Sequence, residues 1–424
     1  MDRAQHAFER LFGPEFGHGK PFHLAPLRAG LAALGDPQTK QPPVIHVAGT
    51  NGKGSTIAFM RAIAEAAGLR AHAFTKPHLF QLNERFVIAH KIANDDALIA
   101  AAERVHAVAP ALTQFDAQVA AAILLFSETP AEVAFIETGM GGRDDSTNVV
   151  TPALSVLTPI GLDHVDALGP RLADIAAHKA GIIKPGVAAI VARQAEDARA
   201  VIEARAAQVG APLFQQGVAW DAHLSSGRLV VQSETRVLDL PPPALHGPHQ
   251  IDNAGLACAA LMHWRDLDDA AYAAGSSWAR WPGRLQPLTR GALSAPIRAR
   301  GGEVWVDAGH NAHAAEALAR ALDAMQRRTP RPTIAIIGIR ARKDAPAFVA
   351  NIARAATAVI GVPLSEDHEL AERIASFAGE YGADSAFAPS LEAAMQKAAL
   401  SPAPRVLICG SFLLAAEALR LEGA

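Results

Sequence analysis

The stretch VIHVAGTNGKGST, which spans residues 44–56, indicates the architecture of the chain. Val44–Val47 is short and apolar, as a buried strand is, and Ser55–Ala67 has the length and composition of a helix. Between them lies a glycine-rich turn that leads into Lys53. Glycines let backbone N–H groups surround phosphate oxygens, while a helix N-terminus and a lysine add positive charge. The pattern therefore predicts a phosphate-binding loop in an α/β domain.

This loop is a shortened relative of the usual phosphate loop. The usual form has four residues between its first glycine and the Gly-Lys pair, whereas here only Thr50 and Asn51 intervene. Gly54 follows the lysine, so the hydroxyl group expected there is displaced to Ser55. The alternative interpretation is a glycine-rich turn without a ligand. Strand, turn, lysine, hydroxyl and helix nevertheless occur in the expected order, which favours phosphate binding.

Short apolar runs alternate with helical stretches through the first half of the chain. The further strands that we predict there are Ala71–Phe74, Val133–Glu137, Leu154–Thr158 and Ala188–Val191. The further helices are Phe115–Phe126, Arg171–Ala180 and Ala195–Val209. Such alternation predicts a mainly parallel sheet with helices on both faces.

The pattern changes after Pro212. Arg228–Leu240 is predicted to form an antiparallel ribbon, followed by a helix over His249–His263. The stretch from Trp281 to Gly302 has the glycine and proline content of a hinge. Alternation then restarts, with predicted strands at Val304–Val306, Thr333–Gly338, Ala358–Ile360 and Arg405–Cys409. The helices predicted between them are His313–Met325, Ala345–Ala356, Glu366–Phe377 and Leu391–Leu400. We therefore predict an N-terminal phosphate-loop domain at residues 1–287 and a smaller, Rossmann-like α/β domain at residues 297–424.

Composition excludes several classes of protein. Half of the 424 residues are apolar and 19% are charged, so the chain is not a disordered polymer. The formal net charge of −3 gives no support to nucleic-acid binding by bulk charge. Two cysteines provide neither a disulfide framework nor a cysteine-rich metal site. Without a signal peptide or an apolar run of membrane-spanning length, we expect a monomeric cytoplasmic protein that binds neither nucleic acid nor membrane.

Polar side chains follow the predicted strands at other places. Glu137 ends an apolar strand and precedes a glycine-rich turn, and ligands bind at the carboxyl ends of parallel strands. A carboxylate that faces a phosphate loop requires a cation between the two, for which Mg²⁺ is the natural choice. His164 follows the Leu154–Thr158 strand and is flanked by Asp163 and Asp166, which favours a metal ligand over a structural histidine. Lys179, by contrast, has the pattern of an ordinary helix residue.

The loop Gly49-Thr50-Asn51-Gly52-Lys53-Gly54-Ser55 resembles that of the folylpolyglutamate synthase and dihydrofolate synthase family, which belongs with the Mur ligases. The resemblance implies that these seven residues bind ATP. It implies two Mg²⁺ ions, with Ser55, Glu137, His164 and Lys179 as ligands and Lys179 carbamylated by CO₂. It further implies that Asp145 and Asn148, in the glycine-rich segment after Glu137, hold a pterin substrate.

The resemblance extends to the second half of the chain. By this resemblance, Asn253 contacts adenine and Arg284, in a Pro-Gly-Arg segment, reaches the ATP phosphates. Asp307 and His310 follow a strand and are expected to face a cleft between the two domains, as ATP- and substrate-binding residues. Ser411 would contact the incoming glutamate. The alternative for each strand-end residue is helix or strand capping. Together these implications make Lys53, His164, Lys179 and His310 the candidate catalytic residues.

Several positions depart from the family pattern. Lys76 stands where the family has a serine that can ligate the first Mg²⁺, and an ammonium group cannot ligate a cation. Either the first metal depends on Ser55 and Glu137, or Lys76 partly substitutes for the metal; the sequence leaves both open. Asp144 replaces an apolar residue, His178 replaces a common glutamate, and Ala308-Gly309 is inverted in order.

Together these features predict an ATP-driven ligase that joins L-glutamate to dihydropteroate or a reduced folate. ATP would convert the acid into an acyl phosphate, which the amine of glutamate then attacks. One rival is a Mur-type ligase for another carboxylate, although we expect no further N-terminal domain before Gly49. Another is a phosphate-loop NTPase switch, which would not need His310, Asn311 and Ser411 after strands of a second domain. The third is an inactive relative, which Lys76 keeps in consideration.

Overall fold

The computed structural model describes residues 2–15 and 23–423, which form two compact units. The first consists of the described part of Met1–Ala244 together with Ile251–Arg280. The second consists of Leu245–Gln250 and the described part of Trp281–Ala424. Residues 281–287, which the sequence analysis assigned to the first domain, therefore lie in the second unit. The reason is that Gln286–Leu288 (β12) pairs with Glu303–Val306 (β13) in the second sheet.

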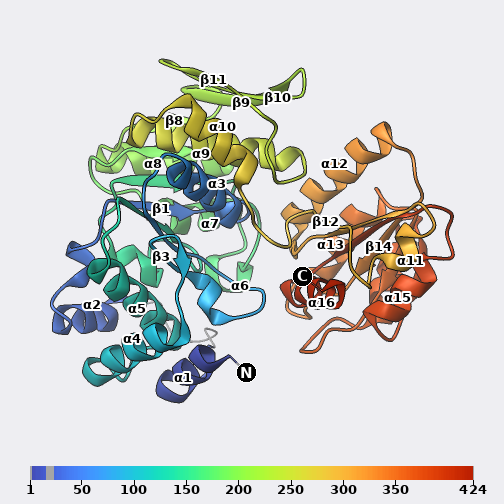
Figure 1. Cartoon of the computed structure of the whole chain (residues 1–424), viewed down its shortest axis with the longest axis horizontal. Helices are drawn as coiled ribbons and strands as arrows, with labels where there is room; N and C mark the ends of the chain where they lie inside the picture. The colour runs from blue at the N-terminus through green and yellow to red at the C-terminus, as the bar shows by residue number, and fades with distance from the viewer. Residues whose placement is uncertain (1, 16–22, 424) are drawn as a thin grey trace. The chain divides into compact units, whose positions relative to one another are not determined.

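The first unit is built on a large sheet (Figure 1). Its eight strands have the order β4-β3-β2-β5-β1-β6-β7-β8. Its strands are β1 (Val44–Ala48), β2 (Ala71–Phe74), β3 (Phe86–Ile88), β4 (Lys91–Ile92), β5 (Val133–Glu137), β6 (Leu154–Leu157), β7 (Ala189–Val191) and β8 (Leu213–Gln215). The six strands from β2 to β8 in this order are parallel, and β3 and β4 add an antiparallel edge. The predicted mainly parallel sheet is confirmed.

Helices cover this sheet and bury its apolar strands. The helices are α1 (Arg3–Phe12), α2 (Leu24–Ala33), α3 (Lys53–Ala66), α4 (Asp95–Val108), α5 (Gln114–Glu128), α6 (Val165–Leu168), α7 (Leu172–Ala180), α8 (Glu196–Val209), α9 (Pro248–Trp264) and α10 (Asp269–Trp278), with 3₁₀ turns η1 (Pro37–Thr39), η2 (Leu82–Arg85) and η3 (Ser146–Val149). Alanine and leucine from α4 and α5 pack with Phe74, Phe86 and Ile136 in one core cluster. Residues of α7 and α8 pack on β6 and β7 in another. All five residues of β1 are buried, so the strand before the phosphate loop is fixed on both faces.

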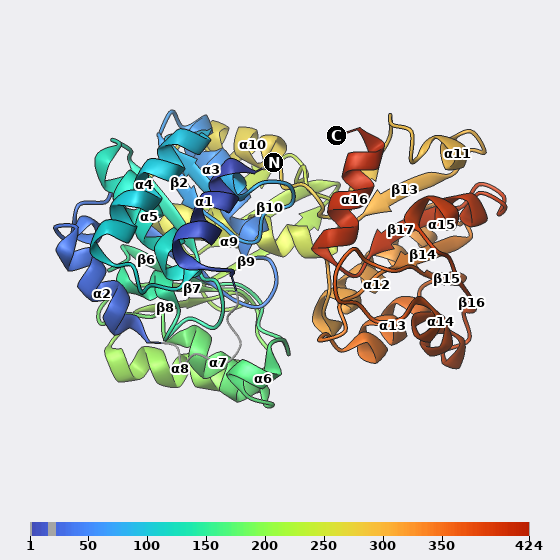
Figure 2. The same ribbon diagram turned by 90° about the horizontal axis from the view of Figure 1, so that it is seen from below.

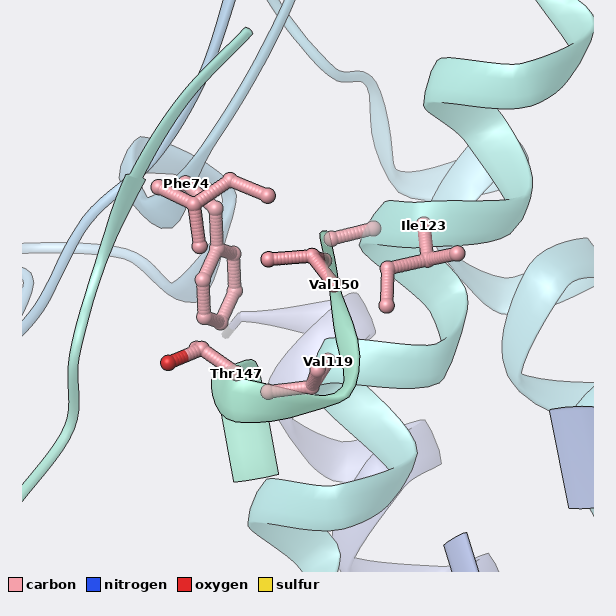
Figure 3. A pocket seen from close by; sticks show the side chains of 7 residues that line it. Phe74, Val119, Ile123, Thr147 and Val150 are labelled. Carbon is pink, nitrogen blue, oxygen red and sulfur yellow. The ribbon is translucent and has the colours of Figure 1, made fainter. Parts of the chain in front are cut away.

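A small apolar pocket lies within the first of these clusters (Figure 3). Its lining residues are Phe74, Val119, Ala122, Ile123, Ile136, Thr147 and Val150. Thr147 supplies the single polar side chain of this lining, so the pocket belongs to the packed core and offers few partners to a polar ligand.

An antiparallel ribbon projects from the first unit beside α10 (Figure 1). The prediction placed it at residues 228–240, and the structure has β10 (Arg228–Ser233) and β11 (Val237–Leu240) there. A third strand, β9 (Trp220–Ser225), which we did not predict, pairs with β10. The alternation of buried and exposed residues along β9 is weak, because only Trp220 and Ala222 are buried and the last three residues are exposed.

The second unit is a six-stranded sheet in the order β12-β13-β17-β14-β15-β16, parallel except for β12. The remaining strands are β14 (Thr333–Ile337), β15 (Ala358–Gly361), β16 (Asp384–Phe387) and β17 (Arg405–Cys409). The helices are α11 (Ala295–Arg298), α12 (Ala312–Arg328), α13 (Ala345–Ala353), α14 (Ala371–Glu380), α15 (Leu391–Ala398) and α16 (Phe412–Glu422). Helices α12, α13 and α14 pack on one face of the sheet, and α11, α15 and α16 lie on the other (Figure 2).

One predicted helix is wrong in its first turn. The helix predicted over Glu366–Phe377 begins instead at Ala371. The backbone N–H of Glu369 donates to Ile339 O, next to the end of β14, which holds this segment in a loop. Among the described residues, no helix is long and apolar enough to cross a membrane.

Candidate active site

The predicted phosphate loop lies between β1 and α3, and two close approaches fix its shape. A Cβ atom at Gly49 would lie 1.8 Å from Thr158 Oγ1, at the end of the neighbouring strand β6. A Cβ atom at Gly52 would lie 2.4 Å from Asn253 Oδ1, on α9. Both glycines have positive φ, 147° and 91°. The loop therefore requires glycine at both positions, and Asn253, predicted to contact adenine, lies directly against it.

Lys53 is held at the mouth of this loop. Its Nζ donates hydrogen bonds to Gly49 O at 3.1 Å and to Thr50 O at 3.2 Å. It also lies 3.7 Å from Glu137 Oε1. Because β1 and β5 are neighbours, with Val47 opposite Glu137, the strand ends bring the two charges together. Glu137, which was predicted to face the phosphate loop, thus lies beside that loop, next to its lysine.

A metal ion would find oxygen ligands here. Glu137 and Ser55 are both almost fully buried, at 3% and 2% exposed. Mg²⁺ is commonly held by one or two protein oxygens, with phosphate oxygens and waters completing the octahedron, so this pair fits a nucleotide-bound Mg²⁺. Among the described residues, no three His, Cys, Asp or Glu side chains form a ready-made metal cluster.

His164, a further predicted ligand, lies beyond the end of β6, at the start of α6. It has a left-handed backbone, with φ of 52°, and its Nε2 lies 3.9 Å from Asp163 Oδ2. Its side chain is 38% exposed, in contrast to buried Glu137 and Ser55. The predicted four-ligand set of Ser55, Glu137, His164 and Lys179 stays a prediction.

Lys179 is an unusual lysine, because it is 5% exposed on α7 and donates from Nζ to Gly49 O at 2.8 Å. Burial, followed by repulsion from Lys53, lowers the pKa of Lys179 to about 7. It is therefore not the solvated helix residue that its sequence pattern indicated. The lowered pKa favours the neutral amine far more than in a solvated lysine.

Asp145 and Asn148 hold the glycine-rich segment after β5 in shape. Asp145 accepts hydrogen bonds from the backbone N–H groups of Met140, at 2.7 Å, and Thr147, at 3.0 Å. Asn148 donates from Nδ2 to Arg143 O and Gly181 O. Both residues were predicted to hold substrate; in this structure these hydrogen bonds order the loop itself.

The same segment is joined to β1 through a buried histidine. Thr147 Oγ1 donates to Asp145 Oδ1 at 2.6 Å, so it has no proton left to give to His46, whose Nε2 lies 2.9 Å away. His46 Nε2 must therefore carry the hydrogen and donate to Thr147. This chain of hydrogen bonds, His46 to Thr147 to Asp145, links the strand of the phosphate loop to the glycine-rich segment.

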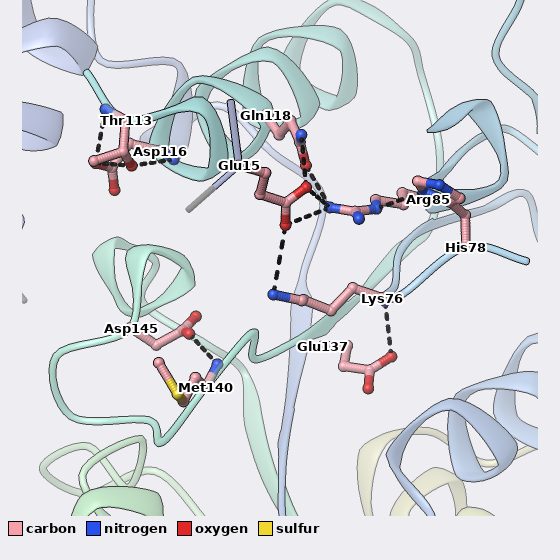
Figure 4. Close-up of polar contacts among 10 residues, drawn as sticks. All are labelled: Glu15, Lys76, His78, Arg85, Thr113, Asp116, Gln118, Glu137, Met140 and Asp145. Carbon is pink, nitrogen blue, oxygen red and sulfur yellow. Dashed lines mark hydrogen bonds and ion pairs between the residues drawn. The ribbon is translucent and has the colours of Figure 1, made fainter. Parts of the chain in front are cut away.

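Lys76 follows β2, and the strand order β2-β5-β1 places it on the side of Glu137 opposite the phosphate loop. Figure 4 shows its contacts with Glu137 and Glu15. Its backbone N–H donates to Glu137 Oε2 at 3.2 Å, but its side chain extends towards Glu15, where Nζ lies 3.7 Å from Oε1. Arg85 Nη1 contacts both oxygens of Glu15, at 3.1 and 3.0 Å. Of the two possibilities left open by the sequence, this favours a first metal held by Ser55 and Glu137. Sequence analysis missed Glu15 and Arg85 because nothing in their local pattern sets them apart.

In the second unit, Asp307 at the end of β13 anchors the turn that follows Gly283. Its Oδ2 accepts the N–H of Leu285 at 2.8 Å, and its Oδ1 accepts the N–H of Gly309 at 2.6 Å. His249, which sequence analysis did not single out, lies nearby; burial lowers its pKa, while Asp307 raises it in part. The polar residues around Asp307 thus form a local cluster of the second unit.

The other predicted residues of the second unit cap helices or contact an aromatic ring. Asn311 and Ser411 accept the N–H groups of Ala314 and Leu414 as N-caps of α12 and α16. The ring of Phe412 lies close to His310 and Arg284. The His310 ring centroid is 5.5 Å from that of Phe412, and the Arg284 guanidinium lies 4.9 Å from the same ring. The capping alternative is thus realised for Asn311 and Ser411.

Comparison with known proteins defines the class. Residues 47–261 match the Mur ligase middle domain, and residues 295–412 match the glutamate ligase domain of Mur ligases. The chain belongs to the Mur ligase family. Within it, the chain is a member of the folylpolyglutamate synthase and dihydrofolate synthase group, as three similar proteins indicate.

The dihydrofolate synthase/folylpolyglutamate synthase of Bacillus subtilis is 33% identical over 355 residues, which cover 79% of this chain and 77% of that protein. The structure of Escherichia coli FolC in complex with DHPP and ADP has a TM-score of 0.86 at 28% identity, and the match covers 99% of this chain and 97% of that one. The Yersinia pestis bifunctional folylpolyglutamate synthase/dihydrofolate synthase, complexed with AMPPNP and Mn ion, has a TM-score of 0.85 at 28% identity. That match covers 97% of this chain and 96% of that one.

Proposed function

We propose that this chain is an ATP-dependent ligase that joins L-glutamate to dihydropteroate and to reduced folates. The observation that carries the proposal is the placement of Lys53 and Glu137, 3.7 Å apart, at the ends of two adjacent parallel strands. A cation on a phosphate loop beside a buried carboxylate suits a nucleotide that carries a divalent metal. The choice of dihydropteroate or folate as the acid, and of glutamate as the amine, is inferred from the relatives of this chain.

The reaction needs two displacements. A carboxylate oxygen of the acid attacks the γ-phosphorus of ATP, and the bond to the bridging oxygen breaks, which yields an acyl phosphate and ADP. The amine nitrogen of glutamate then attacks the acyl carbon, phosphate leaves, and the nitrogen loses a proton. Lys53 would offset negative charge on the phosphates, which otherwise repel the incoming carboxylate. The N–H groups of the loop and of the first turn of α3 would orient the phosphates.

A divalent metal, when bound, would neutralise charge on the phosphoryl group being transferred. Ser55 and Glu137 are the residues that would hold it, and we take Mg²⁺ as the physiological ion, with a second ion as the resemblance implies. His164 remains our candidate for that second site. Arg284, Asp307, His310 and Ser411 remain our candidates for contacts with ATP and glutamate.

We also propose that Lys179 carries a carbamate. A neutral amine attacks the carbon of CO₂, forms an N–C bond and releases a proton, which leaves an anionic oxygen ligand. The burial of Lys179 and its proximity to positively charged Lys53 support the neutral amine that this step requires.

Carbon-13 NMR of the whole protein with labelled bicarbonate tests the carbamate. We expect a carbamate resonance that is absent from Lys179→Ala. A crystal structure with a bare Lys179 amine beside an occupied metal site would refute it.

Mass spectrometry of the products, together with ADP release, tests the function. We expect one added glutamate when dihydropteroate, ATP and glutamate are supplied, and tail extension when tetrahydrofolate replaces dihydropteroate. Omission of either the acid or glutamate should abolish amide formation. ADP release that needs neither substrate would favour an NTPase switch, and a complete absence of ADP release would favour an inactive relative. Activity only with another carboxylate would favour a different Mur-type ligase.

A further inference from the structure

The ammonium group of Lys76 has no hydrogen-bond acceptor among the described residues, although it forms an ion pair. Glu15 is the nearest carboxylate, but both of its oxygens already accept from Arg85, and Gln118 Nε2 also donates to Oε2 at 3.4 Å. At 3.7 Å from Oε1, Lys76 Nζ makes an ion pair without a hydrogen bond. Within residues 2–15 and 23–423, no hydrogen bond is donated by this ammonium group. Two cations, Lys76 and Arg85, thus share one close carboxylate, and Asp145 and Glu137 attract Lys76 more weakly than Glu15 does.

The side chain of Lys76 is only partly exposed to solvent. The Lys76 side chain is 26% exposed, and Arg85 is 5% exposed. Burial, together with repulsion from Arg85, lowers the pKa of Lys76, and the carboxylates around it offset this only in part, namely Glu15, Asp145 and Glu137. An ammonium group removed from water with donors left over is costly unless something else accepts them. The arrangement therefore suits an anionic ligand that reaches Lys76 through its remaining exposed side.

An aromatic ring lies next to the ammonium group. Lys76 Nζ is 4.4 Å from the centroid of the Phe115 ring. The edge of that ring approaches the segment after β5, because a Cβ atom at Gly139 would lie 2.5 Å from Phe115 Cζ. Lys76, Phe115 and Gly139 are thus neighbours on the β2 side of Glu137. A carboxylate attached to a flat, apolar body would complement this combination.

The strand order separates this position from the phosphate loop. The sheet runs β2-β5-β1, so β5 lies between Lys76 and the loop. Glu137 is approached from the two sides: Lys53 Nζ lies near Oε1, whereas the N–H of Lys76 donates to Oε2. The phosphates of a nucleotide belong on the Lys53 side. An acid substrate that must present its carboxylate to the γ-phosphate would approach from the Lys76 side.

We propose that Lys76 is a specificity-determining residue that binds the carboxylate of the acid substrate, with Glu15 and Arg85 holding its side chain in place. The proposal rests on the proposed function, since it names the residue of that site that selects an aromatic carboxylic acid. It also gives a role to a lysine at a position where the family has a metal-binding serine.

The test compares two ligands that differ only in the carboxylate. Calorimetric titration measures the affinity of the full chain for dihydropteroate and for its analogue without the carboxylate. Wild type should bind the acid at least about tenfold more tightly, as a charge-assisted hydrogen bond provides. Lys76→Met should lose about tenfold in affinity for the acid and nothing for the analogue. Lys76→Arg should restore most of the preference, and Lys184→Met, at another partly buried lysine of the first unit, should behave as wild type.

Other outcomes would overturn the proposal. An equal loss of affinity for both ligands in Lys76→Met would mean that Lys76 only supports the fold. No loss of affinity for either ligand would mean that Lys76 does not bind the carboxylate. A loss of AMPPNP affinity of the same size would assign Lys76 to the nucleotide instead. If wild type bound the acid and the analogue equally, this inference would fail while the ligase function stood. If wild type bound neither, both would fail.

Discussion

Glu137 and Asp307 follow buried strands of two different sheets, and each precedes a turn that contains glycine. At the end of β5, Glu137 faces the ammonium group of Lys53 at 3.7 Å. At the end of β13, Asp307 accepts backbone N–H groups with both of its oxygens. The difference lies in the neighbouring loops, because a lysine lies in the loop beside Glu137, whereas Asp307 is surrounded by backbone donors of its own unit. A carboxylate at the end of a strand can therefore either pair with a positive charge or hold a turn through backbone hydrogen bonds. The loop that follows the neighbouring strand determines which of the two it does.

Removal of Lys53, the positive charge that faces Glu137, should have the largest effect on activity. Lys53→Ala removes the cation that faces both the phosphate position and Glu137. We expect ADP formation to fall at least about a hundredfold, since such groups stabilise charge in the transition state. The melting temperature should fall as well, because the substitution takes the ion-pair partner Lys53 away from the buried Glu137 carboxylate, so activity is compared at a temperature where both proteins are folded. Steady-state assays with Lys184→Ala as control measure this, and a loss below tenfold would contradict the assignment.

Removal of the second carboxylate should act on stability instead. Asp307→Ala leaves the N–H groups of Leu285 and Gly309 without acceptors in a site where Asp307 is 4% exposed. We expect the free energy of unfolding to fall by about 2–4 kcal/mol. Urea denaturation measures it, and Asp307→Asn, which keeps one acceptor oxygen, should lose less. Unchanged stability with lost activity would show that Asp307 serves a ligand after all.

Ser411 tests whether a helix cap of the second unit can also bind substrate. Ser411→Ala removes the acceptor of Leu414 N–H, which should cost about 1 kcal/mol of unfolding free energy. Because Ser411 is a candidate contact of glutamate, the same substitution should also raise the KM for glutamate, with a smaller change in kcat. Ser411→Thr retains the hydroxyl group and should restore the cap. A KM for glutamate equal to that of wild type would leave Ser411 with capping alone.

The smallest effect on stability is expected at Glu422, another carboxylate that holds a loop through backbone hydrogen bonds. It accepts the N–H groups of Gly291 and Ser294. Burial raises its pKa, but these hydrogen bonds outweigh burial and lower the pKa below its usual value of 4.5. Its stabilisation is therefore fully present above about pH 4.5 and is lost as the pH falls through the lowered pKa. Glu422→Gln should cost less than about 1 kcal/mol at pH 7, because the site is partly solvated.

Thermal unfolding of Glu422→Gln and wild type at a series of pH values measures this contribution. The difference between the two proteins should shrink in acid. A difference that stays constant down to pH 3 would exclude the carboxylate charge as its source.

Much of the fold could be predicted because apolar runs and turns recur with a clear period. Ala71–Phe74, Val133–Glu137 and Arg405–Cys409 have the predicted bounds. The phosphate loop and Glu137 could also be placed, since parallel strands bring their carboxyl ends to one edge. The start of α14 could not, because a tertiary hydrogen bond from Glu369 to Ile339 holds that segment out of the helix.

The surroundings of Lys76 could not be predicted either. Glu15 lies 61 positions away in the chain and Arg85 belongs to a 3₁₀ turn, so only the folded chain brings them together. Burial of Lys179 was equally hidden, because its helix pattern gives no sign that Nζ reaches Gly49 O. Capping by Asn311 and Ser411 was foreseen only as an alternative, since the same residue types suit caps and ligands.

The buried ring of His46 has a consequence for the behaviour of the whole protein in acid. Burial, with a contribution from Lys184, lowers the pKa of His46 to about 3, so the folded chain keeps the ring neutral. The unfolded chain, in which a histidine has a pKa near 6.5, takes up a proton below that pH. The free energy of unfolding therefore falls as the pH drops from about 6.5 towards 3, by up to about 1.4 kcal/mol per pH unit. The side chain that orders the glycine-rich segment at neutral pH thus makes folding sensitive to mild acidification.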